Sequence, residues 1–137
     1  MINPFSLADE HTAADLQAYL GITVKHLPNL FMLLGPNTGL GHNSIIFMIE
    51  SQINYVMQCL DEMDRRQAAS MLVKDSAVES YNARIQASLK KMVWSAGGCK
   101  SWYINDKGEN FTIWPGFTWK YWLKTRKPDF RQMQFRT

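Results

Sequence analysis

The chain has 137 residues, 46% of them hydrophobic, and a net charge of +3, which together are typical of one globular domain. Its two cysteines, Cys59 and Cys99, fit neither a CxxC metal motif nor a disulfide-rich secreted scaffold, so we expect a reducing, cytoplasmic location. The longest apolar run, Ile45–Ile49, is far shorter than the roughly 20 residues of a membrane-spanning helix, and no basic-then-apolar leader pattern opens the chain, so we expect neither a membrane span nor a signal peptide.

The first half of the chain predicts a strand followed by a long helix. Residues 1–17 show no sustained periodicity and stay unplaced. Leu30–Leu34 is an apolar run between turn residues, which predicts a strand buried on both faces. From Ser44 to Arg66, apolar residues recur at spacings of three and four, which predicts an amphipathic helix. Its expected core face consists of Ile46, Ile49, Ile53, Val56, Leu60 and Met63.

A short strand and a second helix are predicted next. Residues 71–74 are the candidate strand, and the helix is expected from Ala77 to Trp94. Ser76 and Glu79 have the S-x-x-E spacing of a capping box, in which each side chain accepts from the other residue's backbone. The apolar residues of the helix continue at helical spacing, so we expect them to face the core.

The last third predicts a small hairpin and a basic tail. Lys100–Ile104 and Phe111–Trp114 are rich in strand-forming residues and flank a turn at Asp106–Gly108. Residues 116–137 hold six Lys or Arg and one Asp, a charge of +5, so the rest of the chain carries −2. Aromatic rings among these cations are also found in binders of single-stranded nucleic acid. We favour an amphipathic segment with solvated cations, and expect no nucleic-acid partner.

A glycine-bearing loop, Gly35–Asn43, joins the predicted strand to the long helix. Backbone N–H groups at a helix start are unpaired and carry partial positive charge, so they suit an electron-rich ligand atom. No acidic residue precedes Glu50 in the helix, although acids are favoured in the first turn. The spacing leaves open a simpler alternative, in which Asn43 or Ser44 caps the helix and the glycines only make a turn.

The same loop mimics a dinucleotide fingerprint, because Gly39-x-Gly41-x-x-Ser44 follows a predicted strand. We reject a Rossmann site. The third position is serine, and the acidic residues about 20 positions further on lie inside the predicted helix instead of ending a strand.

The segment Pro28–Val56 resembles the part of Baeyer-Villiger-type FAD monooxygenases that returns to the FAD domain after the NADPH domain. Further residues are similar to the family's C-terminal signature: Cys99, Ser101, Trp102, Tyr103, Gly108, Trp114, Pro115 and Gly116. The resemblance covers residues 18–124 and implies the C-terminal portion of an FAD-binding domain, with 125–137 as a basic aromatic tail. The expected fold is therefore an α/β piece of a flavoprotein with two dinucleotide-binding domains.

The resemblance implies that the loop closes over FAD, with backbone N–H groups near the pyrimidine edge of the flavin. The expected cofactor-binding residues are Asn37, Thr38, Gly39, Leu40, Gly41, His42 and Asn43. A helix N-terminus there would stabilise the negative charge of reduced flavin. We expect His42 to form hydrogen bonds within the loop, with acid–base chemistry as the alternative.

The implied function is an FAD- and NADPH-dependent monooxygenase that inserts oxygen into a ketone or oxidises a soft heteroatom of a small organic substrate. The chain has no complete G-x-G-x-x-G, no F-x-G-x-x-x-H-x-x-x-W pattern and, by the same comparison, no NADPH domain with its catalytic arginine. We therefore expect it to be inactive and to bind FAD weakly without those N-terminal domains, and to expose apolar surface on the long helix. The alternative is a non-catalytic binding or assembly module that retains a flavoprotein scaffold.

The remaining candidate residues predict no second chemistry. His11 and His26 have no partners at metal-ligand spacing, so we expect no metal. Ser101 has no histidine nearby in sequence and no nucleophile elbow. Four aromatic residues are expected to pack in the core, with a substrate pocket as the alternative: Trp102, Tyr103, Trp114 and Trp119.

Overall fold

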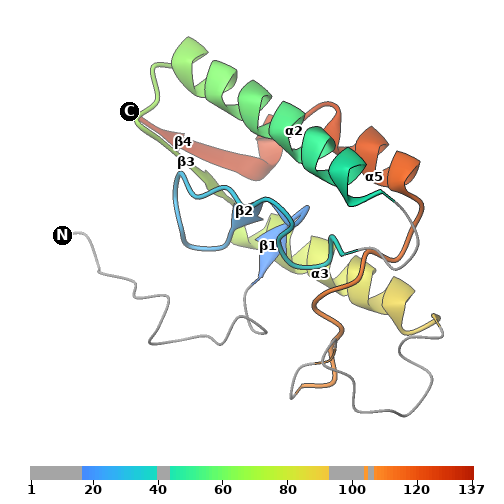
Figure 1. Cartoon of the computed structure of the whole chain (residues 1–137). Coiled ribbons are helices and arrows are strands. Elements are labelled where there is room, and N and C mark those ends of the chain that lie inside the picture. Colours follow the sequence, from blue (N-terminus) through green and yellow to red (C-terminus); the bar gives the residue numbers. More distant parts are fainter. Residues whose placement is uncertain (1–16, 40–43, 93–103, 105–106) are drawn as a thin grey trace.

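The computed structural model describes residues 17–39, 44–92, 104 and 107–137 of the chain (Figure 1). Its elements are β1 (Ala18–Tyr19), β2 (Thr23–Val24), α2 (Ile45–Arg65), β3 (Ser70–Val73), α3 (Asp75–Leu89), α5 (Thr118–Thr125), the 3-10 helix η2 (Phe130–Gln132) and β4 (Met133–Arg136). The mixed helix-and-strand class predicted from the sequence is confirmed. Within the described residues, no helix combines the length and apolar character needed to cross a membrane.

The described strands form two short antiparallel pairs. β1 pairs with β2 through a turn that contains Gly21, where φ is +67°. A side chain at this position would also clash with Thr38, so glycine is required for both reasons. β3 pairs with β4 at the end of the chain, with Met71 opposite Phe135. The β3–β4 pair was not predicted, because its paired residues are 60–66 positions apart in sequence.

Residues 30–34 do not form the predicted buried strand. Phe31 makes one isolated bridge to Thr23, while Leu30, Leu33 and Leu34 are exposed. Leu34 has a φ of +54°, a left-handed conformation that ends the extended run. The prediction is wrong because an apolar run forms a central strand only where strands flank it on both sides, and here β2 offers a single bridging residue.

α2 confirms the long helix predicted from the sequence, with Ser44 as its N-cap. The predicted core face is only partly correct, because Ile46, Ile53 and Leu60 are exposed. The buried positions of the helix are instead Met48, Ser51, Gln52, Tyr55 and Cys59. Apolar residues therefore lie on two sides of α2, and only one of those sides packs against the described part of the chain.

α3 confirms the second helix, but its ends differ from the prediction. Lys74 is the N-cap and makes no side-chain capping bond, so the predicted capping box is wrong. Ser76 lies inside the first turn, where Asp75 supplies the negative charge favoured at a helix start. The helix ends at Leu89 and does not reach Trp94. Four of the five apolar residues predicted at helical spacing are buried in it, namely Val78, Tyr81, Ile85 and Leu89, whereas Met92 lies beyond the helix and is partly buried.

The described residues contain one pairing of the predicted hairpin. Ile104 and Asn110 form an antiparallel bridge on either side of Gly108, where φ is +75°. Ile113 forms a parallel bridge with Gly39. Residues 100–103 and 105–106, which complete the predicted hairpin, lie outside the described residues.

The C-terminal segment packs against the rest of the fold as an amphipathic segment. Tyr121 of α5 is fully buried, and its hydroxyl donates to the Leu20 carbonyl at 2.6 Å and accepts from Gln52 Nε2 at 3.0 Å. Burial raises the pKa of Tyr121 above its ordinary value, so the hydroxyl stays a donor. These bonds join α5, α2 and the β1–β2 turn. The cations Lys124, Arg126 and Lys127 are exposed, as predicted.

Candidate functional site

The candidate site is the loop before α2 and the first turn of that helix. Of the residues predicted to face a ligand, the structure describes Asn37, Thr38 and Gly39. The other four, Leu40, Gly41, His42 and Asn43, lie outside the described residues. The described part of the site is therefore the start of the loop and the beginning of α2.

Asn37 and Thr38 point inward and hold the start of the loop. Asn37 Nδ2 donates to the carbonyls of Asn110 at 2.7 Å and Ile113 at 3.2 Å. Thr38 is fully buried, and its hydroxyl donates to the Gly35 carbonyl at 2.6 Å. With both side chains engaged in this way, they position the loop and leave any ligand contact to its backbone and to later residues.

Gly39 is packed against residues 112–114. Its N–H donates to the Thr112 carbonyl at 2.8 Å, and its carbonyl accepts from Trp114 N–H at 2.9 Å. A Cβ at this position would lie 2.8 Å from the Thr112 carbonyl oxygen, closer than side chains are found. The close approach that requires glycine at position 39 is thus an approach of two backbone segments.

Asn110 anchors this arrangement and was missed by the sequence interpretation. Its Oδ1 accepts from the backbone N–H groups of Thr112 and Ile113, each at 3.1 Å. Its carbonyl accepts from Asn37 and from Gln86 of α3. An asparagine two residues after a turn glycine is a local signal for such a bond, because its side chain reaches the backbone two positions on.

The entrance of α2 is only weakly capped. Ser44 Oγ accepts from Phe47 N–H at 3.5 Å, longer than an ordinary N–H···O bond. The first turn contains no acidic residue. The simpler alternative, a serine cap, is therefore present, and the described residues leave much of the positive end of the helix uncompensated. Ser44, Ile45 and Ile46 are exposed, so this end is accessible on the described surface.

Other sequence candidates take structural roles or stay at the surface. His26 lies 3.1 Å from Asp75 at the surface, and no group of three His, Cys, Asp or Glu within the described ranges is placed to hold a metal. Trp114 is buried and packs edge-on against Tyr121 with ring centroids 5.1 Å apart, as expected of a packing residue. Trp119 is exposed instead. Ser101, Trp102 and Tyr103 lie outside the described residues.

α2 and α5 pack side by side (Figure 1), and both carry exposed large apolar residues. These residues are Ile45, Ile46, Phe47, Ile53, Met57 and Leu60 on α2 and Trp119, Trp122 and Leu123 on α5, with Phe117 just before α5. We call these ten residues the apolar face. The exposed apolar surface predicted for the long helix is thereby confirmed. A face of this kind is typical of an interaction surface.

Comparison with known proteins gives matches in sequence and in fold, although no protein-family model matches the chain. Over 114 residues the chain is 54% identical to a protein named Baeyer-Villiger monooxygenase from Pseudomonas aeruginosa, a match that covers 82% of this chain and 22% of that protein. An oxidised steroid monooxygenase bound to NADP matches with a TM-score of 0.74 and 20% identity, over 90% of this chain and 24% of that one. A structure of OTEMO in complex with FAD and NADP matches with a TM-score of 0.69 and 15% identity, over 87% of this chain and 24% of that one. The chain spans about a quarter of the length of these proteins, in their C-terminal region.

Proposed function

Since the chain belongs to the Baeyer-Villiger type of FAD-dependent monooxygenases, we propose that residues 18–124 form the C-terminal portion of an FAD-binding domain. In this proposal the loop 37–43 and the first turn of α2 face the flavin. The observation that carries it is a helix entrance that is exposed, weakly capped and free of acidic residues, directly after a loop start fixed by buried hydrogen bonds.

The residues present fit a flavin. Asn37 and Gly39 position the loop from behind through bonds to Asn110 and Thr112, and Thr38 does so through its bond to the Gly35 carbonyl. Residues 40–43 and the first backbone N–H groups of α2 then supply the cofactor-facing surface. FAD supplies the redox and oxygen chemistry when bound. The contribution of this chain is partial positive charge beside the pyrimidine edge, where reduced flavin carries negative charge.

The activity we propose for the whole enzyme uses FAD and NADPH, in line with the NADP and FAD bound in the similar solved structures. Its substrate is a small organic molecule with a ketone or a soft heteroatom. Most of the FAD contacts and all of the NADPH contacts come from the other three quarters of such an enzyme. We therefore propose that the chain on its own binds FAD weakly and is inactive.

We propose that the apolar face is covered by the N-terminal FAD and NADPH domains of such an enzyme. The face extends from the entrance of α2 along that helix, so whatever covers it lies next to the flavin-facing loop. A non-catalytic module that acted alone would leave about ten large apolar side chains in water, which soluble monomers rarely do. This observation argues against a chain that acts as an isolated monomer and fits docking to further domains.

Cys59 fits the cytoplasmic location that we propose. It is buried in α2 as a free thiol, and burial raises its pKa to about 12. The thiol therefore stays protonated and unreactive at neutral pH. Buried free thiols of this kind are typical of proteins in reducing compartments.

The proposal is tested by replacing the aligned segment of the Pseudomonas aeruginosa relative with this chain. We expect the purified chimera to retain FAD and to oxidise NADPH faster when a ketone is added. The unaltered relative is the positive control, and the relative truncated before the segment is the negative control. A chimera that unfolds cooperatively but retains no FAD would contradict the proposal.

A further inference from the structure

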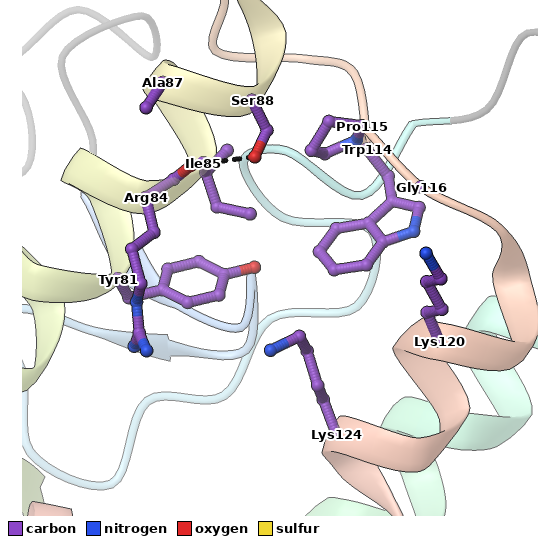
Figure 2. A pocket seen from close by; sticks show the side chains of 10 residues that line it. All are labelled: Tyr81, Arg84, Ile85, Ala87, Ser88, Trp114, Pro115, Gly116, Lys120 and Lys124. Atoms are coloured by element: carbon purple, nitrogen blue, oxygen red, sulfur yellow. Dashed lines mark hydrogen bonds between the residues drawn. The ribbon is translucent and has the colours of Figure 1, made fainter.

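A groove of about 440 Å³ opens between α3 and α5, on residues that the flavin proposal does not use (Figure 2). Its walls include Tyr81, Arg84 and Ile85 from α3, Trp114, and Lys120 and Lys124 from α5. The volume lies within the range of small-molecule sites, roughly 300–1,000 Å³. The indole of Trp114 lines the groove, while the backbone of the same residue pairs with Gly39.

The charged side chains of the groove are all cations. Arg84, Lys120 and Lys124 line it together, and no acidic residue of the described chain does. None of the three has a carboxylate partner among the described residues. Lys120 and Lys124 are four residues apart on one helix, a spacing at which like charges repel. A bound anion would relieve this repulsion.

The hydroxyl of Tyr81 gives a second, independent indication of a ligand. Tyr81 is only 5% exposed, and its buried hydroxyl has no hydrogen-bond partner. Figure 2 shows the hydroxyl pointing into the groove, towards Trp114 and Lys124. Burial raises the pKa of Tyr81 well above its ordinary value, so the group stays a donor. Buried donors without a partner are rare in folded proteins, because they lose their bonds to water.

We propose that this groove binds a small organic anion that carries an aromatic or apolar ring. Lys120, Lys124 and the Tyr81 hydroxyl hold the anionic group, and the ring lies between Trp114 and Ile85. Phosphate monoesters and carboxylates share this chemistry. The site is separate from the proposed flavin-facing loop and does not depend on the chain taking part in monooxygenation.

The test uses the 137-residue chain and four probes followed by tryptophan fluorescence: 1-naphthyl phosphate, 1-naphthoate, uncharged 1-naphthol and inorganic phosphate. We expect saturable binding of one or both ring-bearing anions, and the stronger of the two identifies the ligand source. Naphthol and inorganic phosphate should bind at least about tenfold more weakly, because each lacks one half of the recognised chemistry. Equal binding of naphthol, or no saturation by either ring-bearing anion up to about 10 mM, would overturn the proposal.

Three variants locate the binding. Replacing both lysines, Lys120→Gln and Lys124→Gln, should weaken the ring-bearing anion about tenfold or more. Tyr81→Phe removes only the unpaired hydroxyl and should weaken it several-fold while the fold is retained. Lys127→Gln, an exposed cation that does not line the groove, is the matched control and should leave the affinity unchanged. Unchanged affinity in the lysine and tyrosine variants would exclude this groove as the site.

Discussion

α2 and α3 are both helices with apolar residues at helical spacing, yet they use those residues differently. The apolar positions of α3 are buried against β1 and the rest of the core, and its other side is solvated. α2 buries Met48, Tyr55 and Cys59 and leaves Ile46, Ile53 and Leu60 exposed. The difference shows that the apolar positions of α3 find their packing partners within the described chain, whereas α2 has an apolar side that no described residue covers.

The largest expected effect is a difference in stability between the same Leu→Ala substitution made on α3 and on α2. Leu89 of α3 is 1% exposed and Leu60 of α2 is 41% exposed. We expect Leu89→Ala to lower the free energy of unfolding by about 2–5 kcal/mol, because it removes buried apolar surface and leaves a cavity. Leu60→Ala should change it by less than about 0.5 kcal/mol. Urea unfolding of both variants measures the contrast, and equal losses would mean that the two helices are packed alike.

Removing the buried hydrogen bonds that Tyr121 makes with Gln52 of α2 and with the Leu20 carbonyl should give the next largest loss of stability. Tyr121→Phe removes the hydroxyl that joins Gln52 of α2 to the Leu20 carbonyl, and leaves two buried polar groups without a partner. We expect a loss of about 1–3 kcal/mol in the free energy of unfolding. Gln58→Ala, on the same helix but with its side-chain bonds at the surface, is the control and should cost less than about 1 kcal/mol. A neutral Tyr121→Phe would show that this network does not fix the inner side of α2.

Much of the contrast between the packing of α2 and that of α3 could not be predicted from the sequence. Helix spacing identified both α2 and α3, because a period of 3.6 residues is local information. The burial of Gln52 depends on Tyr121, 69 residues away, and the pairing of β3 with β4 joins equally distant segments. The apolar run at residues 30–34 met the local criteria of a buried strand but lacks flanking strands in the described fold. At the candidate site, a possible serine cap and the absence of acid were readable from the sequence, whereas the weakness of that cap and the anchoring role of Asn110 required the folded contacts.

The pH dependence of stability should report on the buried thiol of Cys59 in α2. Burial raises the pKa of the Cys59 thiol from 9.0 to about 12, so the folded state holds this proton more tightly than the unfolded state. The associated stability is fully present below pH 9 and is lost as pH rises towards 12, by roughly 1 kcal/mol for each pH unit. Unfolding followed at pH 8, 9.5 and 11 measures this loss. Cys59→Ala should show a shallower loss over the same window, and an identical slope would mean that buried tyrosines account for it.

The smallest expected effect tests whether the exposed entrance of α2 faces the flavin. It is measured in the chimera with the Pseudomonas aeruginosa relative. Ile46→Glu places an acid in the first turn, and Ile46→Gln places a neutral side chain of the same size there. A carboxylate at this end opposes a nearby reduced flavin and competes for the same N–H groups. We expect the midpoint potential of the flavin to be lower in the Glu variant than in the Gln variant by on the order of 10 mV.

The comparison of these two variants separates charge from the loss of apolar contact. Both remove the same isoleucine from the apolar face, so any change they share reports on docking of the surrounding domains. Only a difference between them reports on the electrostatics of the helix entrance. If the two potentials coincide while both chimeras retain FAD, the first turn of α2 does not face the flavin, and the apolar side of this helix serves docking alone.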